Sequence, residues 1–162
     1  VKLKELGFEI SLIPIRLLRS IGIDLITVTV VVYHNPECGT SRNVIEMIRA
    51  SGTDPVVIEY LETGWTRPQL LGLFAAANLT PREALRTSKS PAEELGLTDN
   101  SVDDEALLDA MLIHPVLVNR PLVCSPKGVR LCRPSEKVLE ILDNSGSETF
   151  TKEDGEVVKR DR

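Results

Sequence analysis

The sequence has few of the residues that disulfide-rich or nucleic-acid-binding proteins depend on. Its three cysteines in 162 residues are too few, and odd in number, for a disulfide framework. Aromatic residues make up 4% of the chain, no basic run carries aromatics among its residues, and the net charge is −5. This composition argues against a nucleic-acid-binding surface. With 42% hydrophobic residues, we expect one globular domain in a reducing compartment, the cytoplasm.

Long apolar runs are also missing from the N-terminal segment, residues 1–27. Arg16, Arg19 and Asp24 interrupt it. Its longest uncharged stretch, which runs on to Pro36, is well short of the ~20 residues of a membrane-spanning helix. No small-residue cleavage site of a signal peptide follows it. We expect these residues to be a poorly ordered extension of a protein that makes no contact with membranes.

Regular secondary structure is predicted from residue 28 onwards. Residues 28–33 are continuous and β-branched, as in a strand that is buried on both faces. A loop leads to a helix over residues 40–50, which Ser51-Gly52 ends, and a second strand is expected over residues 56–61. This order is typical of a right-handed βαβ unit with parallel strands.

The second half of the domain is predicted to be a helical insert followed by a ββα unit. Helix starts at Thr66, Thr80, Pro91 and Ser101 indicate an insert over about residues 66–113. Short strands are expected over residues 116–119, 122–124 and 129–132, and a last helix from Pro134. We therefore predict an α/β domain over residues 28–143, with a mixed sheet and helices on both faces. Residues 144–162 are predicted to be a polar, mobile C-terminal tail.

Cys38 is the candidate nucleophile, because it lies where the first strand leads into a helix. The unpaired N–H groups and the dipole of a helix N-terminus favour a thiolate over a thiol. Ser41 is placed to donate a hydrogen bond to the sulfur, and Arg42 adds positive charge. His34, four residues before Cys38, is placed either to tune the thiolate or to stabilise the turn.

The motif Cys38-Gly-Thr-Ser41 has serine where a dithiol redox enzyme would have its second cysteine. A disulfide within this loop is therefore impossible, and any disulfide chemistry needs another cysteine of the chain or an external thiol. Cys124 and Cys132 both lie in β-rich segments, and we expect them to be packed in the structure rather than reactive.

Three arginines are candidates for binding an oxyanion. Arg120 and Arg133 each precede a proline at a predicted strand end, and Arg86 lies in the insert. Guanidinium groups match the paired oxygens of a tetrahedral oxyanion, so convergence of the three on Cys38 would create such a site. The alternative for each arginine is a surface salt bridge. No His, Cys, Asp or Glu spacing indicates a metal site.

Three ordered segments resemble a known family. Tyr33-His-Asn-Pro-Glu-Cys-Gly-Thr-Ser-Arg-Asn43, His114-Pro-Val-Leu-Val-Asn-Arg-Pro121 and Arg130-Leu-Cys-Arg-Pro-Ser-Glu136 resemble the glutaredoxin-linked arsenate reductases (ArsC family) of the thioredoxin-fold superfamily. The segment Phe150-Thr-Lys-Glu-Asp-Gly155 also resembles theirs. The resemblance covers about residues 28–160, and it implies a thioredoxin-like fold.

The resemblance also implies a mechanism and roles for the residues. Cys38 would attack arsenate, held by Arg86, Arg120 and Arg133. Glutathione, a co-substrate rather than a bound cofactor, would then attack the cysteinyl arsenate, and glutaredoxin would remove it as a mixed disulfide while arsenite leaves. His34 and Ser41 match positions that lower the thiol pKa, and Pro121 matches the cis-proline of the thioredoxin fold.

Two other functions remain open from the sequence. Spx-type regulators share this fold and bind RNA polymerase, but they usually have the second cysteine that Ser41 replaces here. A related glutathione-dependent thiol reductase would act on another substrate, and the three arginines argue against it.

Overall fold

The centre of the fold is a four-stranded mixed sheet. The computed structural model describes residues 29–143 and 149–159, so the expected extension over residues 1–27 lies outside the described residues. The strands β1 (Val31–His34), β2 (Val56–Glu59), β3 (Leu122–Ser125) and β4 (Gly128–Leu131) lie in the order β2-β1-β3-β4. β1 and β2 are parallel, whereas β3 pairs antiparallel with both β1 and β4. The predicted βαβ and ββα halves of a mixed sheet are confirmed.

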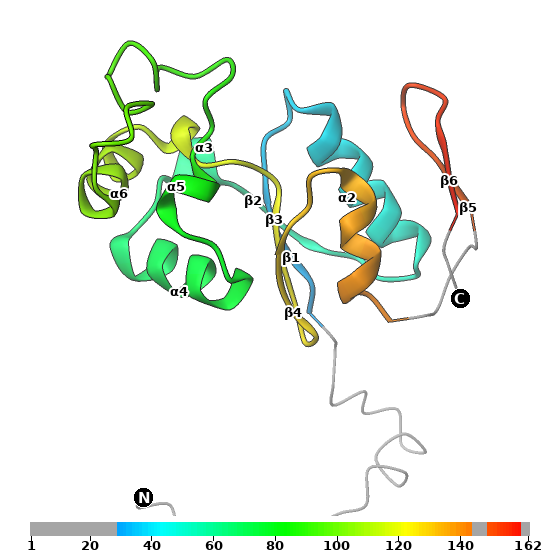
Figure 1. The fold of residues 1–162 in the computed structure, drawn as a ribbon. Coiled ribbons are helices and arrows are strands. Elements are labelled where there is room, and N and C mark those ends of the chain that lie inside the picture. The colour runs from blue at the N-terminus through cyan, green and yellow to red at the C-terminus, as the bar shows by residue number, and fades with distance from the viewer. Residues whose placement is uncertain (1–28, 144–148, 160–162) are drawn as a thin grey trace, which may run out of the picture.

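One face of the sheet is covered by the helix α2 (Gly39–Ala50) and the 3-10 helix η3 (Ser135–Ile141) (Figure 1). The apolar side chains of α2 recur on one side of the helix, and Val44 and Ile48 are fully buried. They pack against the strand residues Val32 and Val123 and against Val138 of η3. This packing fixes the start of α2 at the end of β1.

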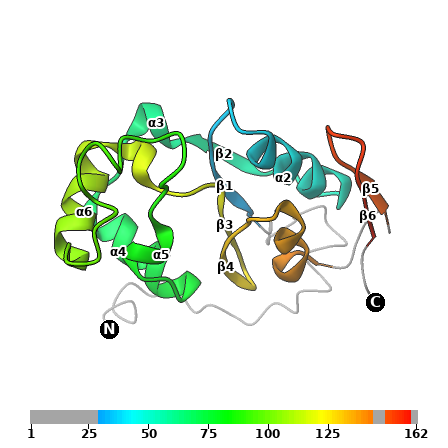
Figure 2. The ribbon, with the colours of Figure 1, turned by 45° about the horizontal axis from the view of Figure 1, so that its top comes forward.

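The other face is covered by α3 (Tyr60–Thr63), which directly follows β2, and by the insert, whose helices are α4 (Arg67–Ala77), α5 (Pro81–Ala84) and α6 (Asp104–Ile113). Figures 1 and 2 both show these helices on the side of the sheet opposite α2. Thr66 and Thr80 each form a capping box, which confirms the predicted starts of α4 and α5. Within the described residues, no helix has the length and apolar character needed to cross a membrane.

Two predicted boundaries at the insert were wrong by one or two residues, and one predicted helix within it is absent. The second strand stops at Glu59, and Tyr60 begins α3 instead. The segment after Pro91 forms turns rather than a helix, and the cap of α6 is Asp103 rather than Ser101. The carboxylate of Asp103 accepts a hydrogen bond from the Ala106 amide at 2.8 Å, so it outcompetes the nearby serine as the cap.

The segment over residues 116–119, predicted to be a strand, is a 3-10 helix, η2 (Pro115–Leu117), followed by one isolated bridge. Val118 bridges to Leu85 of the insert, not to the sheet. Pro115 has no N–H for a sheet ladder, and the Leu117 carbonyl accepts a hydrogen bond from the Arg86 amide at 2.7 Å. The segment before β3 therefore runs beside residues 84–86 of the insert rather than within the sheet.

The C-terminal residues 149–159, predicted to belong to a mobile tail, form the hairpin of β5 (Thr149–Thr151) and β6 (Val157–Lys159). Phe150 and Val158 pack against the core on the α2 side of the sheet. Lys152 is buried and forms an ion pair with Glu136 at 2.9 Å. The polar composition of this segment gave no sign of a hairpin, because only one apolar side chain from each strand packs against the core.

Leu70 and Leu71, neighbours on α4, test this packing. Leu70 is 0% exposed and Leu71 is 47% exposed. Leu70→Ala should lower the free energy of unfolding by about 2–5 kcal/mol, because it leaves a cavity in the core. Leu71→Ala should change it by less than about 0.5 kcal/mol. Urea unfolding curves measure both, and equal losses would contradict the orientation of α4.

Candidate active site

Cys38 occupies the N-cap position of α2, directly after the loop that follows β1. Its amide donates to the Asn35 carbonyl at 3.0 Å, and its own carbonyl accepts the Arg42 amide at 3.0 Å, which begins the helix. Among the described residues no side-chain hydrogen bond caps this helix, and its first turn holds no acidic residue. The first amides and the helix dipole therefore act on the buried sulfur of Cys38 without competition from a capping group.

The pKa of Cys38 lies below that of an ordinary thiol. Burial by itself would raise this pKa, but the amide and hydroxyl groups of Ser41 and the charges of Arg120 and Arg133 together outweigh it. Ser41 is fully buried, and among the described residues its hydroxyl has no hydrogen bond of normal geometry. Cys38 is thus set up to react as a thiolate.

Arg120 and Arg133 are brought to Cys38 by the two segments that flank the hairpin of β3 and β4. The Arg133 guanidinium donates to the Cys38 sulfur at 3.9 Å and to the Arg120 carbonyl at 3.2 Å. The Cys132 amide donates to the Pro121 carbonyl at 2.9 Å, which holds the two segments side by side. The Arg120–Pro121 peptide bond is cis, as the resemblance implies.

Arg86 joins this group from the insert. Its backbone donates to Leu117, and the Asn119 amide donates to the Ala84 carbonyl at 2.8 Å, so the two chain segments run together. Its buried guanidinium donates to the Ser88 carbonyl at 2.8 Å. The pKa of Arg86 is lowered, first by burial and then by the positive charge of Arg120. The backbone bonds place Arg86 beside the segment that leads to Arg120, and the two cations repel each other there.

The three arginines form a positive cluster beside the sulfur. In the described part of the chain, none of them has a carboxylate partner. The Arg120 Nε atom is buried and has no hydrogen-bond partner there. Buried cations without counter-ions are costly, and an anion at this position would relieve both the desolvation and the mutual repulsion. The arrangement is suited to holding a tetrahedral oxyanion against a nucleophilic sulfur.

Tyr60 and Asn35 also belong to the site, and the sequence did not reveal either. Tyr60 is fully buried, and its hydroxyl donates to the Val118 carbonyl at 3.4 Å. Burial raises the pKa of Tyr60, and the Asn35 side chain is close enough to the hydroxyl to oppose this rise, so one tyrosine connects the loop before Cys38 to the loop before Pro121. The Asn35-Pro36 dipeptide signals a turn and could have identified Asn35, whereas Tyr60 has no local signal.

His34 ends β1 and is buried. Its pKa is lowered, chiefly by burial and further by Arg42, while Glu59 opposes the shift. The imidazole is therefore neutral at neutral pH, and it is not among the groups that lower the pKa of Cys38. Its thiolate-tuning role stays a prediction.

The other two cysteines differ from Cys38 in the direction of their pKa shifts. All three cysteines are free. Cys132 is fully buried, and burial raises its pKa to about 12; burial also raises the pKa of the half-buried Cys124. The expectation that both are packed is confirmed. The described residues contain no group of three or more His, Cys, Asp or Glu that could hold a metal ion.

The chain is similar in sequence to the ArsC family, whose sequence model matches residues 33–141. Arsenate reductase ArsI2 of Synechocystis sp. is 64% identical over 133 residues, which are 82% of this chain and 95% of that protein. An arsenate reductase of Escherichia coli is 54% identical over 129 residues, which are 80% of this chain and 92% of that protein.

Solved structures give the same result. The arsenate reductase from Vibrio cholerae superposes with a TM-score of 0.67 and 40% identity, over 71% of this chain and 98% of that one. A structure titled putative arsenate reductase from Yersinia pestis has a TM-score of 0.65 and 35% identity, over 69% of this chain and 99% of that one. Each match spans almost the whole of the solved structure and about seven tenths of this chain.

The cation cluster predicts how Cys38 reacts with iodoacetamide. At neutral pH, Cys38 should be alkylated before Cys124 and Cys132, because only its pKa is lowered. Arg133→Ala removes a charge that favours the thiolate, so the pH midpoint of Cys38 alkylation should rise. Arg130→Ala, on the neighbouring strand, should leave the midpoint unchanged. Peptide mass spectrometry across a pH series measures each rate, and a midpoint unaffected by Arg133→Ala would refute the electrostatic coupling.

Proposed function

The chain belongs to the ArsC family, and on that premise we propose that it reduces arsenate to arsenite with Cys38 as the nucleophile. The observation that carries the proposal is the thiolate-favouring environment of Cys38, 3.9 Å from the Arg133 guanidinium and beside two buried arginines without counter-ions. The relatives that are 54% and 64% identical are themselves named arsenate reductases. Arsenate is a tetrahedral oxyanion, which is the shape and charge that this cluster suits.

In the first step, arsenate binds between Arg86, Arg120 and Arg133, which take up its negative charge. The Cys38 thiolate attacks arsenic, an S–As bond forms, and one arsenate oxygen leaves as water after protonation. The uncapped amides at the start of α2 stabilise the thiolate before the attack and the charge on the oxygens during it. Arsenic is still As(V) at this stage.

The electrons come from external thiols, because Ser41 leaves the loop without a second cysteine. Glutathione attacks the cysteinyl arsenate and forms a second S–As bond, with loss of another water. A glutaredoxin thiolate then attacks the glutathione sulfur, a mixed disulfide forms, and the electron pair of the broken S–As bond reduces arsenic to As(III). Water displaces Cys38 from arsenic, so arsenite leaves and the thiol is regenerated.

This scheme needs no bound cofactor, since glutathione is consumed as a co-substrate. It depends on reduced glutathione and glutaredoxin, and we therefore place the enzyme in the cytoplasm. The Spx-type alternative predicts capture of RNA polymerase without turnover. The thiol reductase alternative predicts reduction of disulfide substrates in preference to arsenate.

Cys38→Ser should abolish arsenate reduction, because the hydroxyl is not ionised at neutral pH. Cys124→Ser and Cys132→Ser should keep most of the activity, since neither thiol takes part in the scheme. The assay follows NADPH consumption with arsenate, glutathione, glutaredoxin and glutathione reductase. Omission of glutaredoxin should stop turnover.

Turnover that survives Cys38→Ser would refute the nucleophile. A large loss in Cys124→Ser, with an unchanged circular dichroism spectrum, would instead indicate a disulfide relay within the chain. If the wild-type protein gives no turnover with all components and retains polymerase from a lysate, the regulator is the better assignment.

A further inference from the structure

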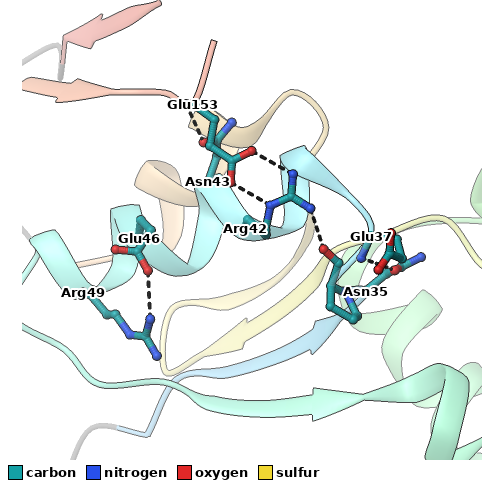
Figure 3. A network of polar contacts seen from close by, with 8 residues as sticks. Asn35, Glu37, Arg42, Asn43, Glu46, Arg49 and Glu153 are labelled. Atoms are coloured by element: carbon teal, nitrogen blue, oxygen red, sulfur yellow. Dashed lines mark hydrogen bonds and ion pairs between the residues drawn. The ribbon is translucent and has the colours of Figure 1, made fainter. Parts of the chain in front are cut away.

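The C-terminal hairpin places one carboxylate beside the catalytic loop. Glu153, in the turn between β5 and β6, accepts two hydrogen bonds from the Arg42 guanidinium, at 2.7 Å from Nε and 2.9 Å from Nη2 (Figure 3). The Glu153 amide donates to the side-chain oxygen of Asn43 at 3.0 Å. The hairpin therefore contacts two consecutive residues in the first turns of α2.

Arg42 also contacts the loop that precedes Cys38. Its Nη1 atom donates to the Pro36 carbonyl at 2.5 Å. Pro36 lies inside the turn that the Cys38 amide closes on the Asn35 carbonyl. A chain of contacts thus runs from the hairpin through one guanidinium to the backbone that orients Cys38.

Contacts of the neighbouring hairpin residues Lys152 and Phe150 hold Glu153 in position. Lys152, its neighbour, is buried and pairs with Glu136 of η3 at 2.9 Å and with Glu156 at 2.7 Å. Phe150 packs against the core. Two independent anchors therefore hold the carboxylate in place, and the Glu153 oxygen lies 3.5 Å from where a Cβ on Gly39 would be.

Charge does not account for this arrangement. A lone carboxylate over the first turn of α2 would disfavour both a thiolate and a bound oxyanion, but the Arg42 guanidinium neutralises it. The main groups that lower the pKa of Cys38 are Ser41, Arg120 and Arg133, and the coupling of Arg42 to the thiolate is smaller than its coupling to Glu153. The contact acts on the geometry of the loop.

We propose that Glu153 is a positioning residue: it holds Arg42 on the Pro36 carbonyl and so fixes the loop that aims Cys38 at its substrate. The inference rests on the proposed function, in which Cys38 is the nucleophile. The C-terminal hairpin then helps to position Cys38 through its hydrogen bonds to Arg42 and Asn43.

Glu153→Gln should lower kcat for arsenate reduction about fivefold, a modest part of the loss that an ångström of misplacement can cause. KM for arsenate should hardly change, because the three arginines are untouched. The pH midpoint of Cys38 alkylation should stay or fall, since a negative charge has been removed. Glu46→Gln, which breaks the exposed pair with Arg49 on the same helix, is the matched control and should leave all three quantities unchanged.

A double-mutant cycle tests whether Glu153 acts through Arg42. Glu153→Gln should cost about fivefold in kcat in the wild-type background and almost nothing in the Arg42→Met background, because the guanidinium that it holds is then gone. Equal losses in both backgrounds would overturn the proposal. So would a loss of kcat accompanied by a rise in the alkylation midpoint, which would indicate an electrostatic role.

If the wild-type protein does not reduce arsenate, the proposed function fails by itself. The same cycle is then measured on the rate of Cys38 alkylation above its pH midpoint, where the thiolate is fully formed. A Glu153→Gln effect on this rate that disappears in the Arg42→Met background supports the positioning role without any arsenate chemistry. No effect, or one that persists there, overturns it.

Discussion

The uncapped N-terminus of α2 is the constraint on which the rest of the site depends. A helix that begins without a capping side chain leaves its first amides unpaired, and this is normally a cost. Here the Cys38 sulfur lies at those amides, and the helix is held in place by Val44 and Ile48 in the core. Core packing therefore offsets the cost of a helix end that has no capping side chain, and the helix end stabilises the thiolate.

The cation cluster depends on the same architecture but on more distant parts of the chain. Arg120 and Arg133 lie on either side of the β3–β4 hairpin, and Arg86 comes from the insert. Backbone hydrogen bonds join these segments, above all Cys132 to Pro121 and Arg86 to Leu117. Burial raises the thiol pKa at Cys38, and only the combined effect of Ser41 and the arginines reverses it. The lowered pKa of the sulfur therefore draws on groups that the fold brings together from distant parts of the chain.

The sequence predicted the parts of the fold that depend on local signals. The β-branched run before Cys38 and the Thr66 and Thr80 caps identify their elements, because capping and strand burial are decided within a few residues. The segment at Val118 and the C-terminal hairpin were assigned wrongly. In both, long-range packing decides the conformation: Val118 bridges to Leu85, and Lys152 pairs with Glu136.

The sequence by itself determined the reactive group: a cysteine between a buried strand and a helix, with serine at the position that a second thiol would need. It also named the three arginines, but each had an equally simple explanation as a surface ion pair. Tertiary structure decided that they lie together, with no carboxylate partner among the described residues, and it added the contacts of Tyr60, Asn35 and Glu153, which local sequence does not reveal. The physical reason is that a thiolate is favoured mainly by its own helix, whereas an anion site requires charges that only the folded chain brings together.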